Sequence, residues 1–106
     1  APIMPYSFSI YERICEYLPT APTKRMFGGI VFFVRGHIVV GVFRDTMMAR
    51  VGIVRASELL QQAGVSPFAK QPNRMRGFVQ VSESYIDRDD TLESLIDDAL
   101  RWNTQL

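Results

Sequence analysis

The sequence has little of what most enzymes and metal proteins need. Its 106 residues include one cysteine and one histidine, too few for a disulfide framework or a zinc site. It has no phosphate-binding loop, because the pair Gly28 and Gly29 lacks the following Gly-Lys-Ser/Thr. The single cysteine favours a reducing, cytoplasmic location. We therefore expect a protein that is not an enzyme and has no cofactor, metal or catalytic residue.

Long apolar runs and targeting signals are scarce as well. Arg35 and Arg44 interrupt the longest apolar stretches, so none reaches the roughly 18 residues that a membrane span needs. Pro2 and Pro5, with no charged stretch before an apolar one, do not fit a signal peptide. The length, a hydrophobic content of 47% and a net charge of +1 predict one globular domain over residues 1–106 that does not bind membranes.

Lysine is rare, and the charges are unevenly distributed. Ten of the 12 basic residues are arginines. Residues 24–76 hold nine basic and two acidic residues, whereas residues 81–106 hold two basic and seven acidic ones. A basic middle region can bind nucleic acid, or it can pair with the acidic region within the fold or across a dimer contact. We favour pairing, because the basic residues are spread over several predicted strands and loops.

Apolar periodicity predicts a helix over about residues 9–18, with Ser9 and Glu12 as a capping box and Pro19 after its end. Three strands are expected at residues 25–34, 37–43 and 47–51. Along the central strand, alternation places Ile38, Val40 and Val42 on one face and Val39 and Phe43 on the other. Both faces of the sheet are therefore apolar, and only one of them is expected to be covered by helices.

The second half of the chain predicts two more helices. A short one spans residues 57–63, with Ser57 as N-cap and Gly64 at its end. A strand follows at residues 77–81, with a short strand near residues 68–71 as an option. The last helix begins with a capping box of Asp90 and Glu93. This order of elements (α, three β, α, one or two β, α) predicts an α+β fold with two layers, in which helices cover one face of an antiparallel sheet.

Arginines are the best candidates for a binding site. Arg25 and Arg50 belong to predicted strands, and Arg74 and Arg76 lie in a polar loop before Gly77. A guanidinium group can bind a carboxylate or a phosphate through two hydrogen bonds. The alternative is internal ion pairing with the acidic C-terminal region.

Other chemically active side chains point to structural roles. Cys15 lies on the apolar stripe of the first predicted helix, so we expect it in the core. His37 stands beside a turn, where a solvated ring is usual. Asp97 and Asp98 point to different sides of their helix and do not form an acid–base pair. Trp102 is expected in a core or dimer contact.

The segment Lys24-Arg25-Met26-Phe27-Gly28-Gly29 carries a family resemblance. By itself, its glycine pair predicts a β-bulge or a close approach of another backbone. With the hairpin glycine Gly36, Arg50 at the end of the third strand, Ser66-Pro67-Phe68 and the strand that follows Met75-Arg76-Gly77, it resembles the N-terminal domain of TfoX-type competence regulators. The resemblance covers residues 23–102, so we expect a single-domain member.

The resemblance implies a two-layer α+β fold of the kind found in secretion chaperones. Longer relatives carry a second, C-terminal domain and are linked to the regulation of natural transformation, and the family offers no catalytic residues to transfer. Two positions depart from the family pattern. Arg50 stands where lysine is common, and His37 stands where a small or polar residue is usual.

We expect a non-enzymatic regulatory or protein-interaction domain that acts through its sheet face, with another protein or with a second copy as a homodimer. One alternative is a small module that binds an anionic ligand through Arg25, Arg50 and Arg76. Another is a weak nucleic-acid binder that uses the basic middle region, for which affinity would fall steeply with salt.

Overall fold

The computed structural model describes residues 6–68 and 75–106, which form an α+β fold with three helices and one six-stranded antiparallel sheet. The elements, in chain order, are α1 (Phe8–Tyr17), β1 (Thr23–Met26), β2 (Gly29–Val34), β3 (His37–Phe43), β4 (Thr46–Arg50), α2 (Ile53–Leu59), β5 (Val65–Pro67), β6 (Phe78–Val81) and α3 (Asp89–Asn103). Across the sheet the strands follow the order β1-β2-β3-β4-β6-β5. The predicted α+β class is confirmed.

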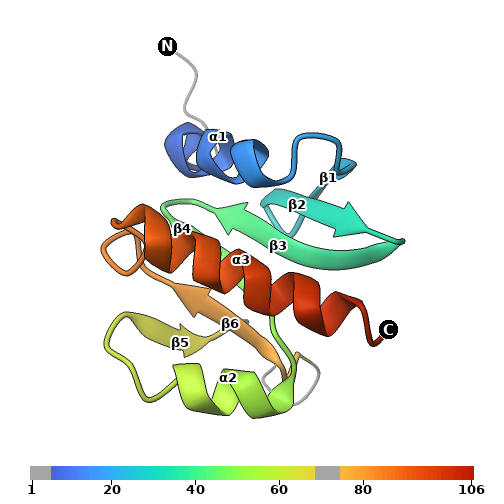
Figure 1. Ribbon diagram of the computed structural model, residues 1–106. Helices are drawn as coiled ribbons and strands as arrows, with labels where there is room; N and C mark the ends of the chain where they lie inside the picture. The colour runs from blue at the N-terminus through green and yellow to red at the C-terminus, as the bar shows by residue number, and fades with distance from the viewer. Residues whose placement is uncertain (1–5, 69–74) are drawn as a thin grey trace.

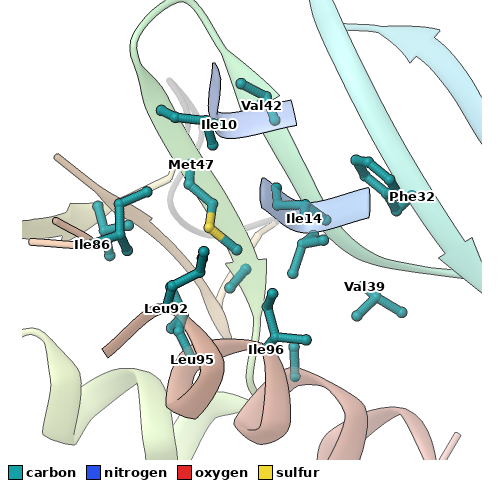
Figure 2. Close-up of a cluster of buried hydrophobic side chains, with 14 of the residues drawn as sticks. Ile10, Ile14, Phe32, Val39, Val42, Met47, Ile86, Leu92, Leu95 and Ile96 are labelled. Carbon is teal, nitrogen blue, oxygen red and sulfur yellow. The ribbon is translucent and has the colours of Figure 1, made fainter. Parts of the chain in front are cut away.

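All three helices lie on one side of the sheet, and α3 crosses it near the middle (Figure 1). Figure 2 shows Ile10 and Ile14 of α1 and Leu92 and Ile96 of α3 around Met47 of β4. All five side chains are at most 1% exposed. This packing makes the main core, and it confirms that helices cover one face of the sheet.

The helix ends differ from the predicted ones. In α1 the hydroxyl of Ser7, rather than Ser9, accepts the backbone N–H of Ile10 at 3.2 Å. In α3 the N-cap position is Arg88, with no side-chain cap, so the predicted capping box of Asp90 and Glu93 is wrong. In the described parts of the chain, no helix is long and apolar enough to cross a membrane.

The second helix is also misplaced in the prediction. Helix α2 runs over Ile53–Leu59, so Ser57 lies inside it and does not cap it. Its N-cap is Gly52, with φ 88°, against which the ring of Trp102 packs so closely that a Cβ atom would lie 2.6 Å from a ring carbon. Contact with α3, which no local pattern reveals, therefore sets the start of α2.

The predicted strand over residues 25–34 is two strands. Phe27 and Gly28 have φ angles of 57° and 80°, which suit the two-residue turn of a tight hairpin. Met26 and Gly29 pair across that turn. A Cβ atom on Gly29 would overlap the Val42 carbonyl oxygen, whereas one on Gly28 would meet open space. The predicted close backbone approach is therefore confirmed at Gly29, and Gly28 serves the turn.

A β-bulge changes which side chains of β3 face the helices. The register with β2 shifts between Phe32, opposite Val40, and Phe33, opposite Ile38. Val39 is the extra residue, and it joins the main core along with Val40. The predictions that Ile38 shares a face with Val40, and Val39 with Phe43, are wrong, because a bulge inserts one residue into the alternation.

The second half of the sheet is formed by β6 and the short edge strand β5. Strand β5 pairs with β6 at Val65–Pro67, upstream of the optional strand near residues 68–71. Of those four residues only Phe68 is described, and it lies outside the strands; residues 69–71 are outside the described part of the chain. Strand β6 confirms the prediction for residues 77–81 except at Gly77, which belongs to the preceding turn.

We predict that Gly29→Ala destabilises the domain by at least about 2 kcal/mol, because the added methyl group must displace the Val42 carbonyl of the neighbouring strand β3. The matched change Gly28→Asn should cost less than about 1 kcal/mol, since asparagine tolerates positive φ and the site is open. Urea denaturation of both variants measures the difference. Equal losses would contradict this account of the two glycines.

Candidate interaction surface

The sheet face that points away from the helices carries a second apolar cluster. Val31, Met48 and Phe68 form its buried centre. Partly buried side chains surround them: Met26, Phe33, Ile38, Phe43, Met75 and Phe78. We call these residues, together with Phe27, the aromatic face. The prediction that the sheet is apolar on both faces is confirmed.

Four phenylalanine rings form a continuous network on this face. The ring centroid of Phe43 lies 5.1 Å from the centroid of Phe68 and 6.2 Å from that of Phe27. Phe68 also approaches Phe27 and Phe78, each at 6.4 Å. Phe68 is 7% exposed, whereas Phe27 is 60% exposed. The network thus has a buried centre and one ring that projects into solvent.

Two glycines leave space for the Phe43 ring to pack on the sheet. The ring of Phe43 lies where a Cβ atom on Gly29 or Gly41 would be, 2.5 Å and 3.0 Å from ring carbons respectively. Gly41 also has Val31 beside it, 2.8 Å from such a Cβ atom. A side chain at either position would push the Phe43 ring away from the sheet. The two glycines therefore allow this ring to pack directly on the backbone of the sheet.

The charges on the aromatic face are positive. Strand register places Lys24 in a row with Val31, and Arg50 opposite Phe78. The guanidinium carbon of Arg50 lies 5.2 Å from the centre of the Phe78 ring, within the range of a cation–π contact. None of the six strands of the described sheet contains an aspartate or a glutamate. The sheet itself therefore contributes only positive charge.

The structure brings two of the four predicted binding arginines near one end of the sheet. Arg50 ends β4, and Arg76 lies in the turn before β6, next to Gly77, whose carbonyl accepts the Val51 N–H at 2.8 Å. Arg25 pairs with Ile30, whose side chain faces the helices, so Arg25 is on the opposite face. Arg74 is outside the described residues. No single pocket joins Arg25 to Arg50.

Ion pairs only partly follow the predicted pairing of the basic and acidic regions. Among the described residues, one pair joins them: Arg55 Nε lies 2.9 Å from Asp98 Oδ2. Arg13 pairs with Asp89, and the other pairs are local within one region. The basic side chains of the strands therefore stay available to the surface.

The ion pair of Arg55 and Asp98 lines two cavities between α2 and α3. One, of about 310 Å³, is lined by Tyr85 and Ser94, and the other, of about 360 Å³, by Ile53 and Trp102. Hydrogen bonding to Asp98 raises the pKa of Arg55 above its usual value and keeps the guanidinium charged. Because Glu58 also accepts from Arg55 at 3.2 Å, this cation is already neutralised. Neither cavity is therefore a good site for an anion.

The remaining candidates occupy structural positions. Cys15 is half-buried against the main core, as expected, and His37 is exposed. Within residues 6–68 and 75–106, no three His, Cys, Asp or Glu side chains come together where they could hold a metal ion. Trp102 covers Gly52 and so contacts the start of α2.

Sequence reasoning missed Phe27 and Phe68 as parts of one surface. The positive φ of Phe27 and the fold of Phe68 back from the edge strand are not visible in an apolar pattern. No local signal marked the turn, because phenylalanine occupies a position where glycine, asparagine or aspartate is usual.

The family model described as TfoX N-terminal domain matches residues 13–102. No curated protein and no solved structure matches the chain. The matched range contains the whole described sheet, all of α2 and most of α3. It also contains the aromatic face.

We predict that Asp98→Asn lowers the free energy of unfolding by about 1 to 2 kcal/mol, because the half-buried Arg55 loses its charged acceptor. Asp97→Asn, on the exposed side of the same helix, should change stability by less than about 0.5 kcal/mol. Urea denaturation at neutral pH compares the two variants. Unchanged stability of Asp98→Asn would show that the pair does not help to hold α2 on α3.

Proposed function

The chain belongs to the TfoX N-terminal domain family, and we propose that it is a regulatory protein-interaction module, not an enzyme, which binds its partner through the aromatic face. The observation that carries the proposal is the phenylalanine network opposite the helices, with Phe27 60% exposed at its rim. Phenylalanine and methionine are enriched in the cores of protein interfaces. A contiguous apolar patch of this kind marks an interaction site more often than a scattered exposed residue does.

The rigidity of this surface supports binding. Phe43 is fixed against Gly29 and Gly41, and Phe78 is held by Arg50. Fixed rings lose little conformational entropy when a partner covers them. Lys24 and Arg50 would add charge-assisted contacts at the rim of the interface.

A binding role also agrees with the state of the polar side chains. Cys15 is partly buried against the core, and the carboxylates of Asp89, Asp90 and Asp98 pair with arginines. A buried thiol behaves as a small apolar side chain, and carboxylates that arginines already engage serve as structural pairs.

A single-stranded nucleic acid is a second candidate, favoured by the exposed Phe27 ring and the partly buried Phe43 and Phe78 rings on a sheet whose strands hold no acidic residue. Bases stack on such rings while basic side chains contact phosphates. Titration with single-stranded DNA at several salt concentrations tests this. Affinity that falls steeply with salt would support it, and no binding at low salt would eliminate it.

We predict that a photo-crosslinking phenylalanine analogue at position 27 captures a specific protein in cells, whereas the same analogue at position 8 does not. The control is matched, since Phe8 is 53% exposed but lies on α1, on the helix side of the sheet. Mass spectrometry of the crosslinked species identifies the partner and shows whether it is a second copy. Equal and unspecific capture from both positions would contradict a role for the aromatic face.

A further inference from the structure

Strand β1 forms an open edge of the sheet. It is the first strand in the sheet order, and no described strand pairs with its outer side. Three of its four residues, Thr23, Lys24 and Arg25, are exposed. The other edge, β5, spans three residues and contains Pro67, which has no N–H to offer. Of the two edges, β1 is the one that can accept another strand.

The backbone of β1 directs two residues outward. The Pro22 carbonyl accepts the Phe33 N–H at 2.9 Å, and Met26 pairs with Gly29 across the turn. In an antiparallel ladder, alternate residues turn both backbone groups toward the same neighbour. Lys24 and Met26 therefore bond to β2, and the N–H and C=O groups of Thr23 and Arg25 point away from the sheet.

The side chains of β1 are positively charged on both faces of the sheet. Register with β2 places Lys24 on the aromatic face and Arg25 on the helix face. Neither has a carboxylate within ion-pair distance among the described residues. Met26 lies on the aromatic face, as Lys24 does, and is partly buried against the apolar cluster there. An added strand would thus meet two cations and then an apolar side chain.

We propose that β1 is a strand-addition site for an extended acidic segment of a partner protein, which pairs antiparallel with it. The segment would carry an apolar residue opposite Met26, followed by acidic residues opposite Arg25 and Lys24. Backbone hydrogen bonds to Thr23 and Arg25 supply affinity, and the side-chain order supplies specificity. Opposite charges directly across a strand pair stabilise it.

A second copy of the chain is a poor occupant of this edge. In the antiparallel register that joins the outward backbone groups of Thr23 in one copy to those of Arg25 in the other, Lys24 of the two copies would lie directly opposite each other. A shift by one residue in each copy would instead place Arg25 opposite Arg25. Like charges facing across a strand pair are destabilising, and basic residues on edge strands are a known guard against self-association. Charge complementarity therefore selects an acidic partner.

The first experiment uses a short synthetic peptide with a Val-Glu-Asp core flanked by threonine and valine, titrated into the isotope-labelled protein. We expect the amide signals of Thr23 and Arg25 to shift. The Glu faces Arg25, so methylating its backbone nitrogen blocks a hydrogen bond to β1 and should weaken binding at least about tenfold. Methylating the Asp nitrogen, which points away from β1, should change affinity by less than about threefold. Equal binding of both methylated peptides would overturn strand addition.

Charge exchange gives the second experiment. The double variant Lys24→Glu and Arg25→Glu should lose the acidic peptide and gain affinity for a Val-Lys-Lys peptide, whereas Arg35→Glu, an exposed change in the β2–β3 turn, should retain the acidic preference. Dispersed amide spectra establish that each variant is folded. If the double variant still prefers the acidic peptide, the proposal is wrong.

This site does not depend on the proposed function of the aromatic face, and one variant separates the two. Phe27→Ser removes the exposed ring at the rim and should leave peptide binding to β1 within about twofold of the original affinity. Loss of peptide binding in Phe27→Ser, with shifts centred on Phe43 and Phe78, would place the peptide on the aromatic face and overturn the edge site.

Discussion

The packing of α3 across the sheet is the contact on which the rest of the structure depends. Leu92, Leu95 and Ile96 fill the main core (Figure 2). The same helix also fixes its neighbours: Asp98 holds Arg55 of α2, and the Asn103 side-chain amide donates to the Val34 carbonyl at 2.9 Å. Because the apolar side of α3 packs on one face of the sheet, other side chains must shield the opposite face from water. Phe68 and Met75 supply part of it.

Strong periodicity explains what the sequence could predict. Helix α3 has an apolar stripe along its whole length, and β3 is apolar at every position after His37 except Gly41. The α+β class and the two apolar faces of the sheet could therefore be predicted. Local signals failed where tertiary contacts compete with them. Ser57 is a good N-cap residue, yet it lies inside α2, since the ring of Trp102 sets the position of Gly52. Nor does any pattern encode the extra residue at Val39.

The candidate surfaces were less predictable than the fold for a related reason. Arg25 and Arg50 looked equivalent in the sequence, but their side chains lie on opposite faces of the sheet. Successive side chains of a strand alternate between the faces, and the two-residue turn at Phe27 and Gly28 sets the register of Arg25. Charge that seemed divided along the chain is divided between layers. Acidic residues occupy helices and turns, and the described strands hold none. The strands therefore add no negative charge to the aromatic face, on which Lys24 and Arg50 lie.

The turn that begins β2 shows a conflict between stability and surface chemistry. Phe27 has a φ of 57°, a conformation that is about 1 to 2 kcal/mol less favourable for a side chain with a Cβ than for glycine. Glycine or asparagine would relieve that strain, but either would remove the most exposed ring of the aromatic face. Selection of random variants for thermal stability alone should therefore replace Phe27 early and erode the surface, whereas selection for binding should retain the strained residue.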